Sequence, residues 1–314
     1  MKRHLSSISI FVVLLAAVAT NAQLRLPRAS QNATVTQTVG ITDITIKYGR
    51  PGVKGRKIFG DAPTDSYAKG EATLDDQYKR PEGMVIVPYG HVWRTGANEA
   101  TQFTVTEDVM INGQKLAAGT YSLHTIPAKD EWTIVFNGTA NQWGSFDYDP
   151  AKDTLRVKAK PLSVRDNQEW MMFTIDPASE DSATVNIRWE KAVVPFTVTV
   201  DTVGLVMAKA RPLVAAAKPE DWRIRYNVGS FAVDHKLTDE GMKMLTDALA
   251  IVDNAIKTNE TYGGLAGRAN ILFAMGKRNE AFAAAEKAIA FGKANKADTS
   301  ALESRVANEK TRKT

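Results

Sequence analysis

The hydrophobic pattern of this 314-residue chain changes its period part-way along. In the first part, apolar and polar residues alternate, as in residues 44–48, which is typical of strands with one buried face. In the second part, apolar residues recur every three or four positions, as in residues 242–252, which is typical of amphipathic helices. We therefore predict an all-β antiparallel sandwich or barrel over residues 23–202, followed by an all-α domain of helical hairpins over residues 203–314.

The β-domain is expected to contain about nine or ten short strands, because alternating segments follow one another at close spacing. Asn112-Gly113 is a strong signal for a two-residue hairpin turn. No segment of helical periodicity interrupts the strands, which argues against a parallel sheet of β-α-β units. Residues 61–83 break the pattern with six acidic and three basic side chains. A loop of this length is expected to be disordered or to form a lid over a neighbouring site.

The N-terminus has the features of an export signal. Two basic residues precede an apolar stretch over residues 8–17, and residues 20–22 are an acceptable cleavage site, with residues 17–19 as a rival. The stretch is shorter than the ~20 residues needed to span a bilayer, so an uncleaved anchor is the weaker alternative. We predict a signal peptide over residues 1–22 and an exported protein of the periplasm or extracellular space, with no membrane span.

The composition limits both the chemistry and the partners. The chain has no cysteine and only four histidines, which excludes disulfides, thiolate metal sites and a cysteine nucleophile. No metal or other cofactor is expected. Residues 203–314 carry 18 basic and 13 acidic side chains, against 20 and 22 in residues 23–202. A nucleic-acid-binding face needs a basic stripe with stacking aromatic residues. Neither domain shows one, so we expect no nucleic-acid partner and interpret the basic excess as a solvated helical surface.

The helical part resembles tetratricopeptide repeats. In residues 265–292, small residues occupy the positions at which that repeat packs its two helices together, namely Ala269, Gly276, Ala281 and Ala288. Residues 222–249 resemble a degenerate earlier copy, although the offset between the copies is 40 residues rather than 34. Two copies are fewer than the roughly three that a free-standing array needs. The hairpins are therefore expected to lean on each other and on the β-domain, with residues 203–217 as a joining helix.

Residues 48–56 form the first candidate ligand-binding loop of the β-domain. This segment is rich in glycine and basic side chains, so its backbone can approach a ligand closely and its cations can bind an anion. The alternative is a tight turn with solvated charges. Loops carry binding residues more often than strands do.

Residues 91–101 form the second candidate loop. They combine an imidazole, an indole, a guanidinium, an amide and a carboxylate, so that His91 can serve as a general base with Glu99 as its acid partner. The favoured alternative is a structural ion pair between Arg94 and Glu99 that pins the loop, with Trp93 in the core. We expect residues 93–99 of this loop to meet the turn at residues 50–56 in space and to form one surface with it, with Arg94 close enough to Glu99 to pair.

Two further segments carry candidate side chains. Ser122 and His124 share one face of a predicted strand, but no acidic residue nearby completes a triad, which favours a merely hydrogen-bonded histidine. Residues 143–148 place aromatic side chains beside an aspartate, which suits stacking on a sugar, although core packing is the commoner fate of tryptophan. The complete set of candidate ligand-binding residues is Tyr48, Arg50, Lys54, Arg56, His91, Trp93, Arg94, Asn98, Glu99 and His124.

The chain carries four longer motifs, YGRPGVKGRKIFG, VPYGHVWRTGANEAT, AGTYSLHTIP and WGSFDY. Together they resemble the bacterial Domain of Unknown Function 2911 family over about residues 30–200. The resemblance implies an exported bacterial protein and places residues 48–56 and 93–99 on the family's motif positions, but it implies no reaction. The insertion at residues 61–83 departs from the family's pattern, and the helical part lies outside it.

Three functions are compatible with these observations. The favoured one is a non-catalytic exported protein whose β-domain binds a small polar or sugar-like ligand and whose helical hairpins bind a protein partner. The first alternative is a periplasmic hydrolase that uses His91, Arg94 and Glu99, or His124; it is disfavoured because nucleophile-elbow, zinc-protease and phosphate-loop motifs are missing. The second is a purely structural envelope protein. Catalysis requires a histidine within hydrogen-bond reach of Glu99 or Ser122 in a cleft.

Overall fold

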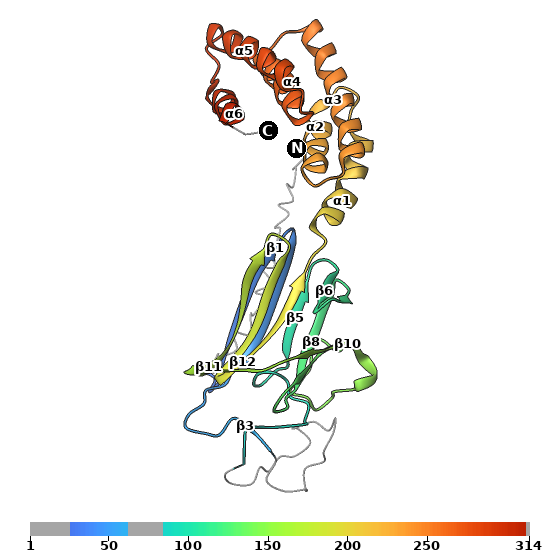
Figure 1. Ribbon diagram of the computed structural model, residues 1–314. Helices are drawn as coiled ribbons and strands as arrows, with labels where there is room; N and C mark the ends of the chain where they lie inside the picture. Colours follow the sequence, from blue (N-terminus) through green and yellow to red (C-terminus); the bar gives the residue numbers. More distant parts are fainter. Residues whose placement is uncertain (1–25, 62–83, 312–314) are drawn as a thin grey trace, which may run out of the picture.

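The computed structural model describes residues 26–61 and 84–311. The predicted signal peptide and nearly all of the predicted insertion, residues 62–83, lie outside these ranges. Within them, a β-domain is followed by six helices, as the change in hydrophobic period predicts. Figure 1 shows the helices at one end of the β-domain, joined to it through the first helix.

Two antiparallel sheets form the β-domain. The first contains β1 (Gln31–Val39), β2 (Thr42–Arg50), β5 (Thr101–Val105), β8 (Gly119–Ile126), β9 (Trp132–Asn137) and β10 (Asp153–Ala159), side by side in that order. The second contains β6 (Val109–Ile111), β7 (Gln114–Leu116), β11 (Leu162–Ser179) and β12 (Ser182–Thr199), in the order β11-β12-β6-β7. A short parallel pair joins β3 (Phe59–Gly60) to β4 (Val87–Pro88).

The apolar faces of both sheets meet in a single core. Phe103, Phe136 and Phe196 lie in contact there, with ring centroids 5.0–6.2 Å apart. Because successive side chains of a strand point to opposite faces, the residues that flank Phe103 turn outward. The outer face of the six-stranded sheet is therefore polar, and the candidate site forms on it.

β11 and β12 differ from the sequence expectation. The alternation predicts separate short strands near residues 170–175, 185–189 and 196–200, whereas the structure has two strands of 18 residues each. The pairing shifts register around Gln168, and Glu190 adopts a left-handed φ of 53°. These bulges interrupt the alternation of apolar and polar residues within each strand. The sequence of one long hairpin therefore looks like that of several short strands.

The helical domain begins directly after β12. Its helices are α1 (Thr202–Ala216), α2 (Trp222–Asp234), α3 (Thr238–Thr258), α4 (Tyr262–Ala274), α5 (Arg278–Ala294) and α6 (Ser300–Thr311). α1 joins the two domains: Leu205 packs against the β-core and Lys209 pairs with Glu107 at 2.5 Å. Arg211 of α1 also pairs with Glu240 of α3 at 2.8 Å.

Two helical hairpins repeat each other. α4 begins 40 residues after α2 (262 against 222), and α5 begins 40 residues after α3 (278 against 238). The turns match as well, since Lys236 and Gly276 both have left-handed φ angles, 66° and 72°. In the first hairpin a Cβ added to Gly241 would lie 2.7 Å from the oxygen of Gly229, so the two helices approach closely. The resemblance to tetratricopeptide repeats itself stays a prediction.

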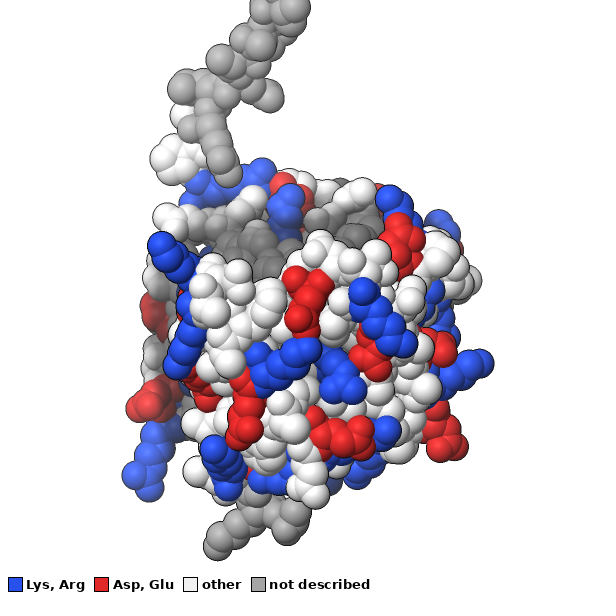
Figure 2. Space-filling model, turned by 90° about the horizontal axis from the view of Figure 1, so that it is seen from above, with Lys and Arg blue, Asp and Glu red and all other residues white. Residues whose placement is uncertain are grey.

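Charged side chains of both signs cover the end of the molecule seen in Figure 2, where basic and acidic groups are interspersed. Several of them pair within the helical domain, among them Arg268 with Asp253 at 2.7 Å and Lys293 with Glu303 at 2.8 Å. No helix in the described part of the chain is long and apolar enough to cross a membrane.

Candidate functional site

A row of polar side chains runs across the outer face of the six-stranded sheet. The strand register places Lys47 of β2 opposite Gln102 of β5, and Gln102 opposite Ser122 of β8. Ser122 in turn lies opposite Asn137 of β9. All four occupy strand positions that alternate with core residues, so this row crosses four neighbouring strands.

The connection between β9 and β10, residues 138–152, folds back over this row. Gln102 Nε2 donates to Asn141 Oδ1 at 2.5 Å, and Gln142 Nε2 donates to Ser122 Oγ at 3.0 Å. The amide nitrogen of Ala100 also donates to the oxygen of Gln142 at 3.0 Å. The first half of the connection is therefore fixed to β5 and β8.

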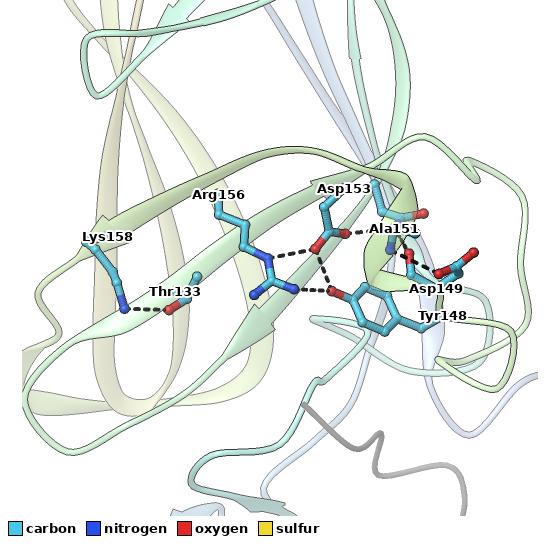
Figure 3. A network of polar contacts seen from close by, with 8 residues as sticks. Thr133, Tyr148, Asp149, Ala151, Asp153, Arg156 and Lys158 are labelled. Atoms are coloured by element: carbon cyan, nitrogen blue, oxygen red, sulfur yellow. Dashed lines mark hydrogen bonds and ion pairs between the residues drawn. The ribbon is translucent and has the colours of Figure 1, made fainter. Parts of the chain in front are cut away.

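The second half of the connection is held by the carboxylate of Asp153 (Figure 3). This carboxylate accepts hydrogen bonds from Tyr148 Oη at 2.7 Å and from Arg156 Nε at 2.7 Å. It also accepts one from Asn137 Nδ2 at 2.8 Å. Burial raises the pKa of Tyr148, and its hydrogen bond to Asp153 raises it further, so the phenol stays a proton donor to the carboxylate. The connection is thus anchored at both ends.

A pocket of about 340 Å³ lies between the connection and the sheet. Its lining includes four amide side chains and two charged ones, namely Asn32, Gln102, Asn141 and Gln142 together with Lys47 and Glu99. Trp143, which is 54% exposed, also lines the pocket, together with Tyr48, Gly49, Ala100 and Ala140. The volume lies at the lower end of the roughly 300–1,000 Å³ typical of small-molecule sites.

The carboxylate of Glu99 is paired with Arg28 at 2.6 Å. The hydrogen bond from Arg28 lowers the pKa of Glu99, so the carboxylate is held in its charged form. The expected ion pair between Arg94 and Glu99 is wrong, because Arg94 Nη1 instead donates to the main-chain oxygen of Asn98 at 2.7 Å. Asn98 has a left-handed φ of 66°, and its carbonyl also accepts from the amide of Gly144. That turn explains why Arg94 meets backbone rather than the carboxylate.

The two predicted loops do meet in space. A Cβ built on Gly49 would overlap the carbonyl oxygen of Ala97, and one built on Gly96 would lie 3.0 Å from the oxygen of Gly49. The backbone of residues 93–99 therefore crosses the end of β2 with no room for a side chain between them. A second hollow of about 210 Å³ lies at this junction, lined in part by Arg56, Trp93, Arg94 and Asn98.

The basic side chains of the first loop bind the protein's own backbone. Arg50 Nε donates to the oxygen of Met171 at 2.8 Å, and Arg56 donates to the oxygens of Gly52 and Val53 at 2.6 and 3.1 Å. The ammonium group of Lys54 lies 5.6 Å above the ring of Trp170. These contacts fix the turn after β2 against β11, which is the structural alternative to anion binding.

Three other candidates are buried. Trp93 stacks on Trp189 with ring centroids 5.7 Å apart, and its indole nitrogen donates to the oxygen of Gly96 at 3.1 Å. Tyr48 packs in the core, where its hydroxyl accepts from the amide of Phe173 at 3.0 Å. His91 is only 3% exposed.

His124 bonds to two serines beneath the connection. Its Nε2 lies 3.1 Å from Ser122 Oγ, and its Nδ1 lies 3.4 Å from Ser145 Oγ. The pair with Ser122 meets the distance condition for catalysis, but both side chains are fully buried and so do not face a cleft. Burial lowers the pKa of His124 to about 3, with a smaller contribution from the charge of Arg94. The imidazole is therefore neutral at physiological pH.

This buried imidazole should make the protein less stable in mild acid. Between the ordinary imidazole pKa of 6.5 and the folded value of about 3, only the unfolded chain binds the proton. Each pH unit in that window costs about 1.4 kcal/mol, so this residue should remove about 2 kcal/mol of the unfolding free energy between pH 6.5 and 5. Urea unfolding at both pH values measures this loss.

A matched pair of variants isolates the contribution of His124. The variant His124→Gln lacks the titrating group and should show a smaller loss of stability between pH 6.5 and 5. In His235→Gln, which changes an exposed histidine after α2, the full loss should remain. Identical pH dependence in all three proteins would contradict the assignment.

Within residues 26–61 and 84–311, the histidine, cysteine, aspartate and glutamate side chains form no group of three or more that could bind a metal ion.

The chain matches a known protein family. Residues 30–198, more than half of the chain, match the family described as "Protein of unknown function (DUF2911)". This segment includes every residue that lines the pocket beside Trp143. No curated protein and no solved structure matches the chain significantly.

Proposed function

The chain belongs to the DUF2911 family of proteins of unknown function, and we propose that its β-domain binds a small polar, sugar-like ligand in the pocket beside Trp143. The observation that carries this proposal is the half-exposed indole in a pocket whose lining also includes four amide and two charged side chains. Tryptophan is mostly buried in folded proteins. An indole that shares a pocket with hydrogen-bonding groups suits a ligand with one apolar face and many hydroxyls.

Two of the amide side chains that line the pocket, Gln102 and Asn141, offer one hydrogen-bond donor and one acceptor to a ligand. Gln102 and Asn141 bond to each other through one polar group each, Nε2 and Oδ1. This leaves Gln102 Oε1 to accept a hydrogen bond and Asn141 Nδ2 to donate one. A sugar hydroxyl both donates and accepts, so neighbouring hydroxyls of a sugar ring satisfy such a pair.

The hydrolase alternative has less support from the geometry. The only histidine–serine pair singled out by the sequence, His124 and Ser122, is fully buried. Glu99 is held by Arg28 rather than by a histidine. The purely structural alternative predicts that no ligand binds, so the binding experiment also tests it.

Removal of the Trp143 indole should weaken sugar binding. We expect Trp143→Ala to lose about 1–2 kcal/mol of binding free energy, or roughly five- to thirtyfold in Kd, because a stacked ligand no longer buries apolar surface there. Isothermal titration against a panel of neutral hexoses, N-acetylhexosamines and hexuronates measures this change.

Trp170→Ala is the matched control for that experiment. Trp170 is also partly exposed, at 39%, but it lies on β11 and outside the pocket. This variant should bind the sugars as the unchanged protein does. Equal losses in both variants, or no binding of any sugar to the unchanged protein, would contradict the proposal.

For the helical domain we propose the binding of a protein partner. Support comes from the repeated hairpins, because stacked helical hairpins commonly present extended binding surfaces. A hollow of about 310 Å³ lies among α3, α4 and α5, with Lys257, Arg268 and Lys287 in its lining. Export to the periplasm or extracellular space stays a prediction from the sequence.

Site-specific crosslinking in the source cell tests the partner proposal. A photoreactive side chain at Lys257, within the hollow, should give one discrete adduct. The same group at Lys243, exposed elsewhere on α3, should give none. The absence of any adduct at Lys257, or equal adducts at both positions, would contradict the proposal.

A further inference from the structure

The charged residues that line the pocket beside Trp143, taken together with Arg28, leave one net positive charge. Of the two charged lining residues, Glu99 uses both carboxylate oxygens to accept from Arg28 Nη1, at 2.8 and 2.6 Å. That pair carries no net charge. The remaining charged group is the ammonium of Lys47.

Glu99 is the acidic residue near Lys47 in the pocket, and the charge of Lys47 contributes to the lowered pKa of Glu99, but the carboxylate is already paired with Arg28. Thr34 of β1 and Gln102 of β5 lie opposite Lys47 on the two sides. The adjacent positions along the same face of β2 are Thr45 and Gly49. Within the described ranges its ammonium takes part in no ion pair. Its side chain is exposed at the mouth of the pocket.

A single free ammonium selects for the charge of the ligand. Lysine acts as a point charge, whereas phosphate groups are commonly bound by forked guanidinium groups or by several donors together. The charge of Arg28 is already balanced by that of Glu99. One ammonium balances one negative charge, which fits a carboxylate better than a dianionic phosphate.

We infer that the ligand of this pocket is an acidic sugar, with its ring against Trp143 and its carboxylate against the ammonium of Lys47. This inference rests on the proposed function and narrows its ligand class to hexuronates and related sugar acids. The amides of Gln102 and Asn141 then bind the ring hydroxyls between these two contacts.

Binding of hexuronates and their methyl esters tests the inference, because the ester keeps the ring and removes the charge. The unchanged protein should bind glucuronate, galacturonate or mannuronate about three- to tenfold more tightly than the corresponding ester at low salt. The preference should shrink at high ionic strength, which screens exposed charges. Titration calorimetry or ligand-observed NMR measures both.

Two lysine variants locate the charge that is responsible. In Lys47→Met, which keeps an aliphatic stem of similar length, acid and ester should bind equally well. Lys160→Met removes an exposed lysine just beyond β10 and should retain the preference.

The outcomes separate this inference from the proposed function. Equal binding of acid and ester by the unchanged protein, or a preference that survives in Lys47→Met, would overturn the inference and leave a sugar pocket intact. If neither acids, esters nor neutral sugars bind, the proposed function itself is wrong.

Discussion

Gly49→Ala should destabilise the β-domain by about 3 kcal/mol or prevent it from folding. A Cβ at this position would overlap the carbonyl oxygen of Ala97, which belongs to backbone rather than to a flexible side chain. β2 cannot move aside easily, because Gly49 is paired with Asn32 of β1 and the preceding residues 44–47 are paired with β5. Overpacking of this kind typically costs 1–3 kcal/mol, and more where backbone must shift.

Thermal unfolding measures this effect, and Gly138→Ala is its control. A Cβ on Gly138 would lie 3.4 Å from the oxygen of Lys152, which is an ordinary contact. We expect Gly49→Ala to lower Tm by roughly 6–12 °C, at about 2–4 °C per kcal/mol for a domain of this size. An unchanged Tm in Gly49→Ala would show that residues 93–99 do not cross β2 as described.

Asp153→Ala should cost about 3 kcal/mol, the second large effect. Its carboxylate is 7% exposed and accepts from Tyr148, Arg156 and Asn137. Removal of the acceptor takes this partner away from Tyr148 Oη and Arg156 Nε, while the fully buried Asn137 keeps only its second bond, to the oxygen of Asp149 at 2.9 Å. Loss of the partner of a buried charged or polar donor is among the costliest single changes in a protein.

Urea unfolding of Asp153→Ala measures this cost. Asp147→Ala changes an exposed aspartate of the same connection and should leave the stability nearly unchanged. Because the network holds the β9–β10 connection in place, Asp153→Ala should also weaken sugar binding beside Trp143. Equal stability of the two variants would contradict the anchoring role of Asp153.

Local patterns predicted most of the architecture. The Asn112-Gly113 turn is an example: both residues have left-handed φ angles, 45° and 80°, and they join β6 to β7 as a two-residue hairpin requires. The alternation of Ile44, Ile46 and Tyr48 likewise places their side chains in the core. Such features depend on neighbouring residues, so the sequence contains them directly.

Contacts between distant segments were not predictable in the same way. Glu99 pairs with Arg28, which lies 71 residues away in the chain, and no local pattern links the two. The guanidinium of Arg50 donates to a main-chain oxygen of β11, 121 residues away. A basic loop and a polar loop were recognisable, but their partners depend on which strands become neighbours.

The pocket was only partly foreseen. The segment that begins at Trp143 was recognised as suited to a sugar, and Glu99 was a candidate residue that also lines the pocket. The sequence does not single out Lys47 and Gln102, because alternate polar positions on a strand have the pattern of an ordinary solvated face, nor Asn141, which lies in the β9–β10 connection. The strand register brings Lys47 beside Gln102, and the folding back of the connection brings Asn141 to Gln102.

The most direct test of the sugar-binding pocket is the indole N–H spectrum of the protein during titration with the sugar panel. The chain has six tryptophans, and the signals of Trp143 and Trp170 can be assigned by single substitution to phenylalanine. We expect the Trp143 signal to shift saturably with at least one sugar while the Trp170 signal stays in place. A Trp143 signal that does not move at any sugar concentration, or a saturable shift confined to another tryptophan, would contradict the proposal.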